Sequence, residues 1–134
     1  LEQRPSDYQY WKLMSNKQIQ AVDQTEYVKI GSHAHFHNNL GNLPFEEACS
    51  ELQESKIFLE NLLQREVTEL AYPDGSYSRE LLGFAEKIGF KVQLAAEGYL
   101  FEEDREDPRI LDRDGVYPAV SWANQMKDML DGKG

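Results

Sequence analysis

The alternation of apolar and polar positions along the chain predicts helices and strands in turn. Residues 15–18 have the form of a capping box, so we expect a helix from about residue 16 to about residue 24. Residues 27–30 predict a short strand. After Pro44, apolar side chains recur at helical spacing from Phe45 to Leu63, which predicts a long amphipathic helix.

The next segments continue this alternation. Residues 67–72 predict a second strand, and the turn-forming residues 73–76 close it. Ser78 is a plausible N-cap for a helix that ends at Gly89 and carries four apolar residues on one side: Leu81, Leu82, Ala85 and Ile88. Residues 90–95 alternate cleanly and predict a third strand.

The last part of the chain changes character. Residues 97–114 are acidic and show no sustained period, so we expect a loop region there. A final helix is expected from about residue 121 to residue 130, with Trp122, Met126 and either Met129 or Leu130 facing inward. Strands that alternate with helices are typical of an α/β fold with parallel strands, and the length of 134 residues indicates one domain, residues 1–134.

Composition narrows the function classes. The chain has 24 acidic and 14 basic residues, a net charge of −10, which argues against nucleic acid or anionic lipid as a partner. No apolar run is long enough to span a bilayer. Cys49 is the only cysteine and lies in a helical pattern, so we expect it to be buried rather than catalytic. The first residue is Leu1, which suggests a mature or excised fragment.

The candidate chemistry lies at three histidines that occupy alternate positions directly after the first predicted strand. They are His33, His35 and His37, and the chain contains no other histidine. Imidazole is the commonest protein ligand for zinc, and the carboxyl ends of parallel strands are where ligands bind in α/β folds. The sequence therefore predicts a metal site here.

The backbone conformation of the segment decides which histidines meet. In a strand all three share one face, whereas in a helical turn only His33 and His37 do. A polar loop that carries surface histidines is the remaining interpretation. These alternatives stay open on the residues alone.

Two stretches resemble motifs of the polysaccharide deacetylases that share the NodB homology domain, also called carbohydrate esterase family four. The pattern Ile-Gly-Ser-His-x-x-x-His-x-x-Leu is matched by residues 30–33, His37 and Leu40, and the resemblance implies that His33 and His37 bind a catalytic divalent metal, zinc before cobalt or nickel. His35 would be a third ligand only if the segment were extended. Residues 71–78 are similar to the family's substrate-groove motif, and residues 109–118 are similar to a late segment of some members.

The groove motif carries further implied roles. The resemblance places Tyr72, Pro73, Gly75 and Tyr77 along the groove that binds the carbohydrate polymer or oligosaccharide, with Tyr72 and the backbone N–H near Asp74 at the reaction centre as the oxyanion donor. Asp74 stands where an aromatic residue is usual, and a carboxylate beside a developing oxyanion is unfavourable. Asp74 can instead be a turn residue, which is the reading that we favour.

The resemblance also exposes a missing motif. Family members carry a Thr-Phe-Asp-Asp-Gly segment that supplies the general base and a third metal ligand, and this chain has no equivalent. We therefore expect a partial or distorted parallel (β/α) barrel, the second half of a deacetylase domain without its N-terminal strands. Its open strand edges predict a homodimer or association with a missing N-terminal half.

Two functions are compatible with these observations. One is a metal-dependent hydrolase that removes acetyl groups from an N-acetylglucosamine-containing or acetylated polysaccharide, acting on amide bonds by resemblance, with this chain inactive alone. The other is a non-catalytic remnant that binds carbohydrate or serves as a scaffold. The resemblance also suggests a location at the cell envelope, periplasmic or extracellular.

Overall fold

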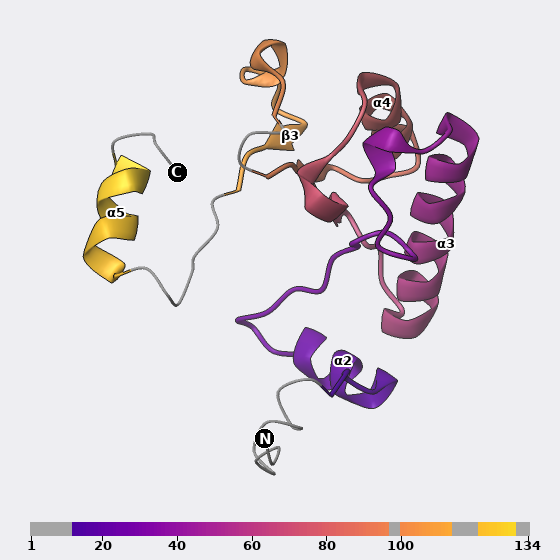
Figure 1. The fold of residues 1–134 in the computed structure, drawn as a ribbon. Helices are drawn as coiled ribbons and strands as arrows, with labels where there is room; N and C mark the ends of the chain where they lie inside the picture. Colours follow the sequence, from indigo (N-terminus) through magenta and orange to yellow (C-terminus); the bar gives the residue numbers. More distant parts are fainter. Residues whose placement is uncertain (1–11, 97–99, 114–120, 131–134) are drawn as a thin grey trace, which may run out of the picture.

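The fold contains a parallel three-stranded sheet, one face of which is covered by two helices, labelled α3 and α4 in Figure 1. The computed structural model describes residues 12–96, 100–113 and 121–130. Its helices are α2 (Asn16–Asp23), α3 (Phe45–Leu63), α4 (Arg79–Lys87) and α5 (Trp122–Leu130), and its strands are β1 (Glu69–Ala71), β2 (Val92–Leu94) and β3 (Ile110–Leu111). Short 3-10 turns occur at η1 (Leu40–Asn42), η2 (Pro73–Gly75) and η3 (Glu102–Asp104).

The helix ends follow the capping chemistry of the sequence. The capping box at Ser15 is present in both directions, with the Ser15 side chain bonded to Gln18 N–H and the Gln18 side chain bonded to Ser15 N–H. The Ser78 side chain accepts from Leu81 N–H at the start of α4. Gly89 has φ +105, a left-handed conformation that suits glycine, just after α4 ends. These predicted helix boundaries are confirmed.

The sheet has the order β1-β2-β3, and every pairing in it is parallel. Leu70 of β1 lies opposite Gln93 of β2, which in turn lies opposite Ile110 of β3. On the other side of β1, Ser32 forms a one-residue parallel bridge to Leu70. All four segments therefore end at the same edge of the sheet, the carboxyl edge.

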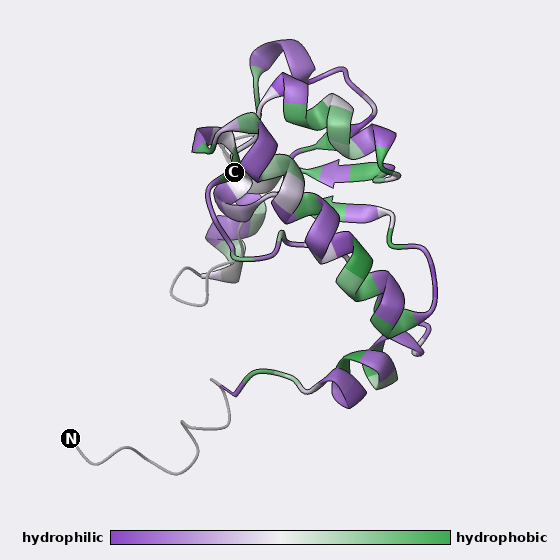
Figure 2. Cartoon of the chain, turned by 90° about the vertical axis from the view of Figure 1, so that its right-hand side faces the viewer, coloured by the Kyte–Doolittle hydropathy of each residue, from purple (hydrophilic) through white to green (hydrophobic). Residues whose placement is uncertain are grey.

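The two faces of the sheet differ in how they are covered. Leu70, Gln93 and Ile110 share one face and are 0–1% exposed, because α3 and α4 pack over it. Successive residues of a strand point to opposite faces. On the opposite face Val92 is 37% and Leu111 is 52% exposed, so the described residues leave it largely uncovered. Figure 2 views α3 from its outer side, on which hydrophilic residues alternate with exposed hydrophobic ones.

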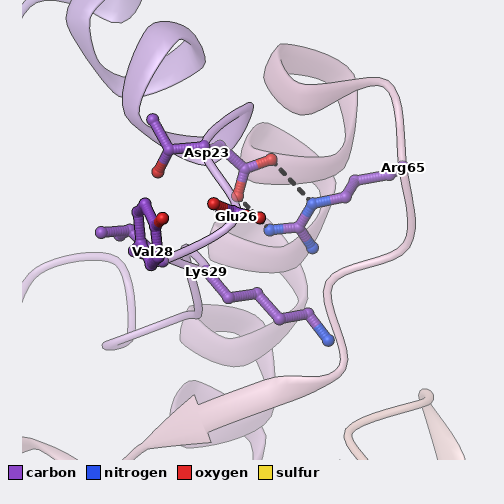
Figure 3. A pocket seen from close by; sticks show the side chains of 7 residues that line it. Asp23, Glu26, Val28, Lys29 and Arg65 are labelled. Carbon is purple, nitrogen blue, oxygen red and sulfur yellow. Dashed lines mark hydrogen bonds and ion pairs between the residues drawn. The ribbon is translucent and has the colours of Figure 1, made fainter.

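The predicted strand at residues 27–30 is wrong, because β-type pairing begins only at Ser32. The cause is a side-chain pair that takes both backbone groups of Ile30. Asp23 accepts from Ile30 N–H at 3.0 Å, and Arg65 donates to the Ile30 carbonyl at 2.9 Å. Arg65 also donates from Nε to Asp23 at 2.8 Å, the pair drawn in Figure 3 at the wall of an open pocket.

The structure differs from the sequence predictions in three further places. Residues 97–114 are not wholly loop, because β3 lies within them and pairs with β2. The strand at residues 90–95 exists, but it buries Gln93 and leaves Val92 partly exposed, since the face that receives Val92 is open. Helix α5 forms at the expected residues, yet Met126 is 37% and Leu130 is 81% exposed; the side chains of Trp122 and Met129 lie outside the described residues.

The structure also bears on the predictions for Cys49 and for membrane-spanning segments. Cys49 is buried, as predicted, and its burial raises the pKa of the thiol above the ordinary value. Within residues 12–96, 100–113 and 121–130, each helix is too short or too polar to cross a membrane.

Asp23 gives a pH-dependent contribution to stability. The hydrogen bond from Arg65 is the main reason that the pKa of Asp23 is lowered from 3.8. A lowered pKa stabilises the fold above the pKa of the unfolded state, and the effect is lost as the pH falls through the folded-state pKa. Asp23→Asn should therefore cost about 1–3 kcal/mol at pH 7 and progressively less below about pH 4. Urea unfolding at pH 7 and pH 3 measures both values.

Glu66→Gln is the matched control, because Glu66 lies beside Arg65 and is exposed. This change should leave the unfolding free energy within about 0.5 kcal/mol of the parent chain at both pH values. An equal loss in both variants would contradict the role given to Asp23.

Candidate metal and substrate site

The histidine loop, residues 33–38, begins directly after the bridge between Ser32 and β1. Ser32 N–H donates to the Glu69 carbonyl at 2.8 Å, and Ala71 N–H donates to the Ser32 carbonyl at 2.9 Å. The buried hydroxyl of Ser32 lies 2.7 Å from the hydroxyl of Ser55 on α3. These bonds fix the start of the loop at the carboxyl edge of the sheet.

The loop brings two of the three histidines together. The ring centroids of His33 and His37 are 4.8 Å apart, with an interplanar angle of 79°. His33 Nδ1 lies 2.7 Å from the Ala71 carbonyl, which holds the ring against the end of β1. The segment is neither strand nor helix, because Ala34 (φ 62) and His37 (φ 59) are left-handed and turn the chain back on itself.

His35 lies apart from this pair. Its ring packs against Phe36 at 4.3 Å, and its Nε2 atom is 3.8 Å from a carboxylate oxygen of Glu54 on α3. Across the part of the chain that the structure describes, no three side chains of His, Cys, Asp or Glu are grouped so that they could hold a metal ion. The residues that the structure places together are thus His33 and His37.

Glu51 is the residue at this site that the sequence analysis missed. It is 6% exposed on the inner side of α3, and its carboxylate accepts from the backbone N–H of His35 at 3.3 Å and of Phe36 at 3.0 Å, and from the Asn38 side chain. A signal for it was present, because Glu51 and Ser55 are polar residues four apart within the apolar stripe of this helix. A buried carboxylate needs such partners.

The tyrosines of the predicted groove motif lie in the core. Tyr72 is 0% exposed and its hydroxyl donates to Gln93. Tyr77 is 4% exposed and donates to Asp104 at 2.7 Å. Burial raises the pKa of Tyr77 to about 12 and keeps its hydroxyl protonated as that donor. The predicted substrate contacts of these two side chains are not available in this structure.

Asp74 and Gly75 form the turn at the end of β1. Asp74 is exposed and left-handed (φ 54), and Pro73 before it is buried. Among the described residues, no hydrogen-bond partner meets the Asp74 N–H. The Arg113 side chain reaches over from the end of β3 and donates to the Tyr72 carbonyl at 2.8 Å. This turn and the histidine loop therefore leave adjacent segments of the same sheet edge.

A pocket of ≈ 330 Å³ lies between the histidine loop and α3. His33, His35 and Ala34 line it from the loop, and Ser55, Phe58 and Leu59 line it from the helix. Phe58 is 50% exposed, so the pocket has an apolar wall that is open to solvent. The histidine site thus has a concave surface next to it.

Gly75 should be intolerant of any side chain. It has φ +73, and a Cβ atom there would lie 2.3 Å from the Ala96 backbone nitrogen. Gly75→Ala should destabilise the chain by about 2–4 kcal/mol through strain and overlap. Gly83→Ala is the control, because a Cβ atom on this α4 glycine would meet nothing within 4 Å and should stabilise the chain by about 0.5–1 kcal/mol. Thermal unfolding compares the two, and equal effects would contradict the close approach to Ala96.

Solved structures with this fold include two deacetylases. The Streptococcus pyogenes deacetylase PplD, solved in complex with acetate, superposes with a TM-score of 0.73 at 22% identity, over 92% of this chain and 54% of PplD. The de-N-acetylase from Aggregatibacter actinomycetemcomitans gives a TM-score of 0.69 at 12% identity, over 87% of this chain and 53% of that protein. These likenesses show the fold, and this chain spans about half of each protein.

Sequence comparison assigns the family. The YxkH protein of Bacillus subtilis (strain 168), whose name assigns it to the polysaccharide deacetylases, is 33% identical over 70 residues, which are 52% of this chain and 25% of YxkH. The sequence pattern of the family described as "Polysaccharide deacetylase" matches residues 6–93, more than half of the chain. The expected resemblance and the expected α/β fold with a parallel sheet, part of a (β/α) barrel, are confirmed, and the chain belongs to the polysaccharide deacetylase family.

Proposed function

We propose that this chain carries part of the site of a metal-dependent hydrolase that removes acetyl groups from a polysaccharide. The observation that carries the proposal is the close approach of His33 and His37 at the carboxyl edge of the sheet. Family membership supports the deacetylase chemistry, and the name de-N-acetylase of the Aggregatibacter relative favours an amide bond. The substrate class that we propose is an acetylated glycan of the cell envelope.

The two histidines fit a divalent metal. Because His33 Nδ1 is held by the Ala71 carbonyl, its Nε2 atom is left for a metal, which is the usual arrangement of a metal-bound imidazole. His37 stands against the same ring and supplies a second nitrogen. Zinc prefers such nitrogen ligands and takes three protein ligands in most catalytic sites. His33 and His37 would therefore hold the ion together with a ligand from beyond the described residues.

The rest of the edge supplies the groups that acyl hydrolysis requires. When bound, a divalent ion would polarise the acetyl carbonyl and lower the pKa of a water molecule. The Asp74 N–H, which has no partner among the described residues, would donate to the developing oxyanion. The pocket beside His33 would receive part of the sugar chain, with Phe58 as its apolar wall.

The uncovered sheet face supports the proposal that the chain works with a further segment. Val92 and Leu111 are exposed on that face, and among the described residues none pairs with the free side of Ser32. Unpaired strand edges and open apolar faces are normally covered by association. Either a second copy or a further segment of a deacetylase domain would cover them, and such a segment would also supply the general base and the third ligand.

The histidine pair predicts the pattern of metal binding. His33→Ala and His37→Ala should each abolish measurable zinc binding, whereas His35→Ala should change the affinity by less than about threefold, because its ring lies on Glu54 and Phe36. Calorimetric titration of the full chain with zinc, cobalt and nickel measures this. Equal loss in all three variants would favour a site made by three histidines.

Without a positioned general base, this chain is expected to be a slow deacetylase. The chain alone should release acetate from chitin oligomers or acetylated xylan about 10²–10⁴-fold more slowly than a deacetylase with a positioned base. An acetate assay with and without zinc measures the rate, with His33→Ala as the background. Robust turnover that persists in His33→Ala would contradict the proposed site.

A further inference from the structure

We propose that Glu51 is the positioning residue that holds His33 and His37 in register for a metal. The inference rests on the proposed function, since it assigns a role within the same site. Glu51 lies on α3, and its carboxylate accepts from the backbone N–H groups of His35 and Phe36, which lie between the two histidines. It also accepts from the side chain of Asn38, which directly follows His37.

The loop needs such a restraint because its own backbone does not favour this shape. Ala34 and His37 are both left-handed, with φ 62 and φ 59, and side-chain-bearing residues seldom adopt that region. In this loop the rings of His33 and His37 lie 4.8 Å apart. Glu51 bonds the residues between these two turns, so its carboxylate holds the reversed shape in place.

The other hydrogen bonds near the loop fix only its beginning. The bond between the hydroxyls of Ser32 and Ser55 and the bridge to β1 fix the start of the loop, before His33. His33 itself is held by the Ala71 carbonyl. Neither contact restrains residues 35–38, and among the described residues Glu51 is the side chain of α3 that bonds their backbone. The position of His37 relative to His33 therefore depends on Glu51.

The role requires a carboxylate. Oε2 accepts from His35 and Phe36 N–H, and Oε1 accepts from Asn38 Nδ2. A glutamine offers one acceptor oxygen and one NH₂ group, so it must place a donor against one of these sets of donors. Glu51→Gln keeps the volume and the helix-forming character of the side chain while removing half of the clamp.

The experiment uses the full chain with three variants and two measurements. Glu51→Gln tests the clamp and Asn38→Ala tests it from the exposed loop side, while Glu47→Gln is the control, since it removes the same charge from an exposed position one turn earlier on α3. Nuclear Overhauser contacts between the ring protons of His33 and His37 report the geometry without metal. Calorimetric titration with zinc reports the affinity, and circular dichroism reports whether α3 is retained.

We expect Glu51→Gln to lose the contact between the rings and to bind zinc about 10–100-fold more weakly at unchanged helicity, with Asn38→Ala intermediate and Glu47→Gln like the parent chain. Retention of both the ring contact and the zinc affinity in Glu51→Gln would overturn the inference. If Glu51→Gln fails to fold, Asn38→Ala decides: loss of its ring contact supports the clamp, and full retention overturns it.

The two proposals fail separately. If the parent chain binds no zinc while its ring contact still depends on Glu51, the proposed function fails and the positioning role stands. If the parent chain binds zinc and Glu51→Gln binds it equally well, the proposed function stands and the positioning role fails.

Discussion

The pairing of Ser32 with β1 is the contact on which the arrangement of the site depends. Two backbone hydrogen bonds, to Glu69 and from Ala71, join a segment without any other strand character to the edge of the sheet. Because the pairing is parallel, the chain that follows Ser32 leaves the sheet at the same edge as the turn after β1. The histidine loop and the Pro73–Gly75 turn become neighbours for this reason, although about forty residues separate them in the sequence.

Side chains hold the backbone on both sides of this pairing, before Ser32 and after it. Before Ser32, Asp23 accepts from the Ile30 N–H and Arg65 donates to the Ile30 carbonyl. After Ser32, the Glu51 carboxylate accepts from the N–H groups of His35 and Phe36 in the histidine loop. In both places a charged side chain bonds irregular backbone that no neighbouring strand pairs with, and so supplies the hydrogen bonds that a sheet would otherwise provide.

The two faces of the sheet are covered to different extents, as expected for part of a barrel. One face carries Leu70, Gln93 and Ile110 under α3 and α4, and the other exposes Val92 and Leu111. In a closed barrel the second face is the packed interior. This chain spans about half of PplD, and the strands among its described residues form an open sheet.

The sequence alone determined the elements whose signals are local. Capping at Ser15 and Ser78, the apolar stripe of α3, the stop at Gly89 and the two family motifs were all readable, because each depends on residues a few positions apart. The predicted strand at residues 27–30 was wrong, and β3 was missed within the loop region predicted at residues 97–114, because strand formation depends on partners that are distant in the sequence. The same limit applied to Tyr72, whose side chain the sheet turns toward the core.

The family motif named His33 and His37, but only the tertiary structure decided how these two histidines meet and what holds them. Three imidazoles at alternate positions are compatible with a strand, a helical turn or a surface loop, and the choice among these came from left-handed residues at 34 and 37 together with Glu51 from α3. A left-handed residue without glycine leaves no mark in a sequence, and a glutamate on a helix is ordinarily a surface residue. The geometry of the site was therefore a property of contacts between segments rather than of the motif itself.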